Sequence, residues 1–326
     1  MKSVTFRRER EAIWAELEAL VQQIERTGLR GLLPSQAARL PTVYRATLSS
    51  LSVARAISLD ANVLAYLESL ASRAFVATYG AKTHPLAAAA AFLGRRFPEA
   101  VRAAWRQVAL SALVMALGAL TGYLLTRQDP GHFYALVSED MAQGRGPSST
   151  TAELRDILYH DKTAADLLTA FAMMLFTHNS QVGMLCFATG FAAGLPTLLL
   201  LFYNGVGLGA FGALYAGRGL GWEFWAWVLP HGVTELLAVV LCGAAGLVVA
   251  EALLFPGRHT RLENLALRGR EAGVMVMGAV CLLLVAGLIE GIFRQVVDDV
   301  PTRLLVAAVS AAAWTVYFAR TRGPRP

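Results

Sequence analysis

Charged residues are scarce in this chain of 326 residues. They make up 16% of the sequence, whereas hydrophobic residues make up 56%. An average soluble domain carries roughly 25% charged residues. The composition is therefore atypical of a soluble enzyme or binding domain and indicates an integral membrane protein.

Cysteine is also rare, with three residues: Cys186, Cys242 and Cys281. Each lies inside an apolar run, and the chain has no Cys-x-x-Cys or Cys/His spacing suited to a zinc site. We expect these cysteines to be reduced packing residues. We also expect no metal and no cofactor.

Residues 1–28 lack a continuous apolar run, so we expect no cleavable signal peptide there. Instead, apolar residues recur at helical spacing among Arg, Glu and Gln: Ile13, Leu17, Leu20 and Ile24. Similar stripes follow at 36–57 and 61–80. The sequence therefore predicts a soluble helical bundle over residues 1–106.

The rest of the chain contains long apolar runs with few charges: 107–126, 167–217, 224–255, 272–293 and 303–319. A membrane-spanning helix needs roughly 20 apolar residues, so 167–217 is long enough for two passes and a turn. Both Gly194–Pro196 and Tyr203–Gly205 could hold that turn. The predicted fold is all-α: a polytopic membrane protein with about six transmembrane helices over residues 107–326.

Arginines mark one side of the predicted membrane domain. Several precede the first span and others lie between later spans: Arg95, Arg96, Arg102, Arg106, Arg258, Arg261, Arg268 and Arg270. Cytoplasmic flanks are enriched in Lys and Arg, so both termini are predicted to be cytoplasmic and the acidic-leaning 127–165 segment to lie on the outer face. The net charge of +6 then reflects contact with anionic membrane lipids, and no nucleic-acid partner is expected.

Ionisable and amide residues occur at matching depths in several spans. His231 and Glu235 are four residues apart and can reach each other on one face of a helix. A charge at the bilayer centre costs roughly 3 kcal/mol on insertion scales, so such residues are expected to meet in the bundle interior. The candidate polar cluster comprises His178, Asn179, Asn204, His231, Glu235 and Glu290. It is either a site for an ion, proton or ligand, or a structural network that holds helices together.

Glycines in the apolar runs predict close helix packing. The Gly207–Gly212 stretch, GLGAFG, has the spacing of a dinucleotide-binding motif but lacks the strand and the βαβ unit that such a site needs. Small residues four apart let membrane helices approach closely. The predicted packing residues are Gly190, Gly194, Gly205 and Gly209.

Four aromatic residues gather near one span boundary: Tyr215, Trp222, Trp225 and Trp227. Aromatic residues are enriched where membrane helices cross the water interface. We therefore interpret these four as an interfacial belt.

Several stretches together resemble one known family. They are LPTVYR with Leu40, Tyr44 and Arg45, and the stretches Tyr66–Gly80, Phe176–Gly209, His231–Leu247 and Ala286–Phe293. In the order and spacing of H-N, N-G, H-G-x-x-E and L-I-E-G, the chain is similar to stage II sporulation protein M (SpoIIM)-like membrane proteins over nearly its whole length. The resemblance implies a multi-span protein of the bacterial inner membrane, without catalytic activity, that anchors a complex including peptidoglycan-remodelling enzymes.

Three functions follow as hypotheses. In the first, the chain is a non-enzymatic scaffold that binds a cytoplasmic protein through residues 1–100, recruits cell-envelope proteins and forms a homodimer through small-residue seams. In the second, it is a transporter or channel for an ion or small solute, and the His/Glu cluster lines the path. A more distant alternative is an intramembrane hydrolase, although HGVTE at 231–235 supplies one His and one Glu without a third zinc ligand.

Overall fold

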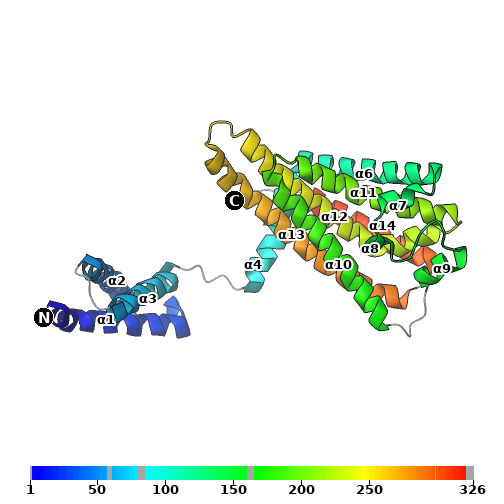
Figure 1. Ribbon diagram of the computed structural model, residues 1–326. Coiled ribbons are helices and arrows are strands. Elements are labelled where there is room, and N and C mark those ends of the chain that lie inside the picture. The colour runs from blue at the N-terminus through cyan, green and yellow to red at the C-terminus, as the bar shows by residue number, and fades with distance from the viewer. Residues whose placement is uncertain (1, 57–60, 80–84, 160–164, 298, 321–326) are drawn as a thin grey trace. The chain divides into compact units, whose positions relative to one another are not determined.

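The computed structural model describes residues 2–56, 61–79, 85–159, 165–297 and 299–320, and this part of the chain contains helices and no strands. It forms two compact units, Met1–Pro85 and Leu86–Pro326. We describe each unit by itself (Figure 1). The predicted all-α polytopic membrane fold is confirmed.

The first unit contains three helices, α1 (Lys2–Thr27), α2 (Pro34–Ala56) and α3 (Ala61–Tyr79), each of which packs against the other two. The predicted stripe on α1 faces this core: Leu17, Leu20 and Ile24 are buried, and Ile13 packs at the core edge. The neighbouring helices add apolar residues such as Leu40 of α2 and Leu67 of α3. The unit therefore has a hydrophobic core of its own.

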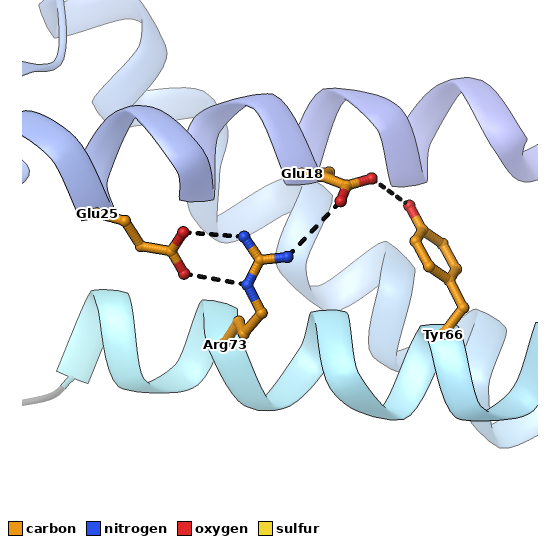
Figure 2. Close-up of polar contacts among 4 residues, drawn as sticks. All are labelled: Glu18, Glu25, Tyr66 and Arg73. Atoms are coloured by element: carbon orange, nitrogen blue, oxygen red, sulfur yellow. Dashed lines mark hydrogen bonds and ion pairs between the residues drawn. The ribbon is translucent and has the colours of Figure 1, made fainter.

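Polar contacts join α1 and α3 along the surface of the first unit (Figure 2). Arg73 donates to both carboxylate oxygens of Glu25, at 3.0 and 2.9 Å, and its third nitrogen lies 3.6 Å from Glu18. The Tyr66 hydroxyl donates to the other Glu18 oxygen at 2.7 Å. Exposed pairs of this kind contribute little free energy, so their main effect is to hold the two helices in register.

The boundary between the units lies at Pro85, earlier than the expected position at residue 106. The helix α5 (Phe97–Ala103) shares a core with the later membrane helices through Phe97 and Val101. The Phe97 ring lies so close to Gly278 that a Cβ atom on that glycine would collide with it. The apolar stripe in 86–104 looks the same whether it faces a soluble bundle or membrane helices, and only packing separates the two cases.

The second unit contains six long helices: α6 (Trp105–Gln128), α10 (Ala165–Ala188), α11 (Leu195–Gly217), α12 (Gly221–Leu254), α13 (Arg261–Val296) and α14 (Val300–Ala319). Over the described residues, all except α10 are long and apolar enough to cross a membrane. At 24 residues α10 is as long as α6, but the side chains of residues 165–176 lie outside the described part.

The turn within 167–217 lies at the first of its two predicted positions. A 3-10 turn at Thr189–Phe191 is followed by Ala193 and Gly194 with positive φ values of 59° and 76°. Pro196 then occupies the first turn of α11, where a missing N–H is tolerated. The alternative at Tyr203–Gly205 is instead continuous helix.

Helices α6 and α11 lie side by side along much of their length (Figure 1). A Cβ atom added to any of four glycines in this seam would collide with a main-chain carbonyl oxygen of the facing helix: Gly118, Gly122, Gly205 and Gly209. Gly190 lies against the backbone of Gly246 in α12 in the same way. Gly194 sits at the positive-φ turn, with Ala250 beside it.

Helix α12 is the central helix of the second unit. It contacts α6, α10, α11, α13 and α14, and most of its apolar stretch is buried. A polar side chain on this helix therefore meets protein on most sides. This explains how a histidine and a glutamate can be accommodated in its middle.

Residues 129–159, called the cap segment here, connect α6 to α10. They form three short helices joined by turns, α7 (His132–Leu136), α8 (Glu139–Ala142) and α9 (Thr151–Tyr159). Phe133 of this segment packs edge-on against Phe211 of α11, with ring centroids 5.2 Å apart. Other aromatic residues at this end were expected to form an interfacial belt, but Tyr215 and Trp227 are buried in the same core, and Trp222 is 74% exposed.

Candidate functional site

A cavity of about 330 Å³ lies between α10, α11 and α12, beneath the cap segment. Five of the six residues of the predicted polar cluster line it: His178, Asn179, Asn204, His231 and Glu235. The sixth, Glu290, belongs to α13, but its side chain lies outside the described residues. The structure therefore brings together the described members of the cluster from three different spans.

These residues lie at similar depth. At 1.5 Å per residue, His178 lies about 20 Å from the start of α10, and Glu235 lies about 21 Å from the start of α12. Asn204 lies about 20 Å from the end of α11. All three helix ends lie on the side of the cap segment. A hydrocarbon layer is roughly 30 Å thick, so a depth of about 20 Å is consistent with a position inside it.

Glu235 is the acidic residue of the described cavity lining, and 3% of its surface is exposed. Its Oε2 atom accepts a 2.6 Å hydrogen bond from the Asn179 side chain of α10. Its Oε1 atom is buried and has no hydrogen-bond partner among the described residues. The expected contact with His231 on the same helix is thus replaced by a bond between helices.

Two histidines line the same cavity as this carboxyl group. His231 is 4% exposed, and its ring lies edge-on to Trp227 at 6.3 Å between centroids. The side chains of His178 and Asn204 interact with each other across α10 and α11. The Asn204 amide also lies 3.9 Å from the sulfur of Met115 in α6.

The cavity wall toward the cap segment is apolar and aromatic. It includes Phe211 of α11 and Phe224 and Trp227 of α12, none of which the sequence analysis assigned to a site. One signal was present in the sequence, because Phe224, Trp227, His231 and Glu235 follow one another at spacings of three, four and four. Such spacing places aromatic and polar residues on a single helical face.

Arg145 of the cap segment covers the cavity and is 7% exposed. Its guanidinium donates to the main-chain oxygens of Ala142 at 2.9 Å and Met141 at 2.7 Å. It also lies 4.6 Å from the centre of the Phe211 ring. Burial lowers the pKa of Arg145, an effect partly offset by the nearby Tyr215. The sequence analysis did not identify this residue.

The described residues contain no group of three or more His, Cys, Asp or Glu side chains arranged to hold a metal ion. The three cysteines are free thiols and do not line the cavity. The site therefore offers a buried carboxylate, two amides and two imidazoles at one end of an apolar space. Small-molecule sites commonly combine an apolar wall with a few polar groups in this way.

Comparison with known families places two matches on the chain. The family model described as stage II sporulation protein M matches residues 111–293, which include every residue of the predicted polar cluster. A second model, described as a domain of unknown function (DUF8413), matches residues 4–80, within the first compact unit. No curated protein and no solved structure matches the chain.

Proposed function

We propose that this chain, which belongs to the stage II sporulation protein M family, is a non-enzymatic multi-pass membrane protein that carries a small solute. In this proposal the solute enters the cavity from the side of the cap segment and is held at mid-membrane depth by the polar cluster. The family is not a known enzyme family.

The observation that carries this proposal is the unpaired Oε1 atom of Glu235. A buried acceptor without a donor costs about 1–3 kcal/mol, so a network with a purely structural role would be expected to satisfy both oxygens. Ionisable groups within membrane helices commonly mark solute or ion pathways. Binding at the membrane midplane is also the usual arrangement in secondary transporters.

The test is solute uptake into proteoliposomes that contain the full chain. Radiolabelled cationic, anionic and neutral solutes would be compared with protein-free liposomes. Leu200→Trp would fill the cavity, because Leu200 lines it, whereas Leu199→Trp provides a matched control at a side chain that is 60% exposed. We expect uptake of at least one class that Leu200→Trp abolishes and Leu199→Trp preserves. Uptake no faster than in protein-free liposomes for every class would refute the proposal.

A second candidate function is that of a scaffold for cell-envelope proteins. The observation that favours it is the first unit, which has its own hydrophobic core and its own family match, separate from that of the membrane unit. A small helical unit next to a membrane domain is suited to binding a cytoplasmic protein. In this role the membrane unit recruits envelope partners, and a homodimer would present two such units.

The scaffold role can be tested by purifying the full chain and a version lacking residues 1–85 under the same mild solubilisation. A scaffold should retain a reproducible set of envelope proteins, including peptidoglycan-remodelling enzymes, that depends on residues 1–85. The same set recovered with both versions would count against a role for the first unit.

We also propose that the chain lies in the bacterial cytoplasmic membrane with both termini inside. Six spans, with α10 counted among them, return the chain to its starting side. Arginines lie at or just beyond the helix ends away from the cap segment, including Arg106, Arg258 and Arg261. Cytoplasmic flanks carry such an excess of basic residues. Reporter fusions after Pro147 and Pro326 should report opposite sides of the membrane, and the same side for both would refute this topology.

A further inference from the structure

The cavity has two chemically different ends. Its deep end holds the Glu235 carboxyl group, and its end near the cap segment is walled by Phe211, Phe224 and Trp227. Glu235 and Trp227 both belong to α12 and are separated along the helix by about 12 Å. A ligand that fills this space must therefore suit an acid at one end and aromatic rings at the other.

The unpaired oxygen of Glu235 requires a donor. Asn179 satisfies Oε2, and Oε1 has no partner among the described residues. Among the described lining residues, Arg145 carries a permanent positive charge. Its guanidinium donates to two main-chain oxygens and lies over Phe211, so it is not the donor to Glu235 Oε1. The other titratable groups of the lining are His178, His231 and Tyr203. An ammonium group from a ligand would supply both the missing hydrogen bond and a counter-charge.

The aromatic end favours an apolar body and disfavours a strongly hydrated ion. Phe211 and Trp227 are 7% and 6% exposed, so they are held in place by surrounding protein. A volume of about 330 Å³ lies at the lower end of the range of roughly 300–1,000 Å³ typical of small-molecule sites.

We propose that the cavity binds a small organic monocation, whose ammonium group donates to Glu235 Oε1 and whose apolar body packs along Phe211 and Trp227. This inference rests on the proposed solute-carrying function and names the class of solute. It concerns recognition alone and involves no covalent step.

The test uses two probes of the same shape, 4-phenylbutylammonium and the neutral 4-phenylbutanol. Their chains are long enough to reach from the aromatic end toward Glu235. Binding would be measured by calorimetry on the full chain in nanodiscs of zwitterionic lipid, with empty nanodiscs as the baseline. We expect the wild-type protein to bind the ammonium roughly tenfold to a hundredfold more tightly than the alcohol, the range expected for a hydrogen bond to a charged group.

Substitutions then locate the recognition. Glu235→Gln should reduce the affinity for the ammonium to that for the alcohol, whereas Glu251→Gln, on the same helix but outside the cavity lining, should leave it unchanged. If Glu235→Gln fails to fold, competition in the wild-type protein decides. Added 4-phenylbutylammonium should displace bound 4-phenylbutanol, and it should do so at a concentration at least about tenfold lower than the concentration of alcohol needed to displace the bound ammonium.

Two results would overturn the inference. The first is that the wild-type protein binds the alcohol as tightly as the ammonium, or more tightly. The second is that Glu235→Gln binds the ammonium with the same affinity as the wild type. Either result, combined with uptake of an anionic or neutral solute that Leu200→Trp abolishes, would leave the carrier proposal standing. Failure of both probes to bind, together with no uptake of any solute class, would remove both proposals.

Discussion

Asn179 of α10 and Glu235 of α12 are joined by a 2.6 Å hydrogen bond between residues 56 positions apart in the chain. The bond links two long helices of the membrane unit, and the second oxygen of the carboxyl group has no partner among the described residues. One contact thus both stabilises the bundle and leaves an acceptor for a ligand.

Replacing Asn179 with alanine should destabilise the membrane unit. The substitution removes the donor to a buried carboxyl group, and an unsatisfied buried group costs about 1–3 kcal/mol. The expected result is a lower midpoint of thermal unfolding in detergent, followed by intrinsic fluorescence. Thr315→Ala is the control, because Thr315 is exposed on α14 and its hydroxyl donates within its own helix. Equal midpoints for the two variants would show that the bond contributes little.

Gly205 and Gly207, on the same helix, should respond in opposite ways to alanine. A Cβ atom at Gly205 would collide with the carbonyl oxygen of Met115, whereas nothing lies within 4 Å of a Cβ at Gly207. We expect Gly205→Ala to lose about 1–3 kcal/mol through overpacking. Gly207→Ala should be neutral or gain up to about 1 kcal/mol from helix propensity. Chemical unfolding in mixed micelles would measure both, and similar losses would contradict the seam between α6 and α11.

Arg145 should hold the cap segment over the cavity. Replacing it with glutamine removes hydrogen bonds to the main-chain oxygens of Met141 and Ala142 and the contact with Phe211. Bonds to charged groups contribute about 1.5–3 kcal/mol, so amide hydrogen exchange in this segment should become roughly tenfold to a hundredfold faster. Exchange mass spectrometry would detect the change. Arg127→Gln, at the exposed end of α6, should leave exchange unaltered, and equal effects in both variants would refute the role of Arg145.

Tyr66 should make the first unit sensitive to alkaline pH. Burial, together with its hydrogen bond to Glu18 (Figure 2), raises the pKa of Tyr66 from 10.0 to about 12. The folded state therefore holds this proton more tightly than the unfolded state. The resulting stabilisation is present below pH 10.0 and is lost as the pH rises toward about 12.

Spectrophotometric titration of tyrosinate can check this shift. Subtracting the curve of Tyr66→Phe from that of the wild type should leave a single step near pH 12. Glu18→Gln should move the step toward lower pH without restoring the ordinary value, because burial is the larger cause. A step at the ordinary pKa of tyrosine in the wild type would contradict the contact.

Much of the candidate site could be predicted from the sequence because lipid is a demanding solvent. An ionisable residue such as Glu235 is costly against hydrocarbon, so its position in an apolar run already indicated an interior location. Residue spacing in continuous helices then gave approximate depth, which placed His178 and His231 in the same half of the membrane. The roles of Arg145 and Trp227 could not be inferred in this way, because a loop arginine and an interfacial tryptophan have the same local sequence features wherever they pack.

By itself, the sequence determined the helical content, the membrane character of the later part of the chain and the family, since these follow from local composition, periodicity and motif order. Only the tertiary structure decided that Asn179 and not His231 binds Glu235, that residues 86–104 join the membrane unit, and that a cavity lies beside the polar cluster. The physical reason is that these features depend on which helix faces meet. Helix rotation and packing are set by many contacts between distant segments, and no local pattern specifies them.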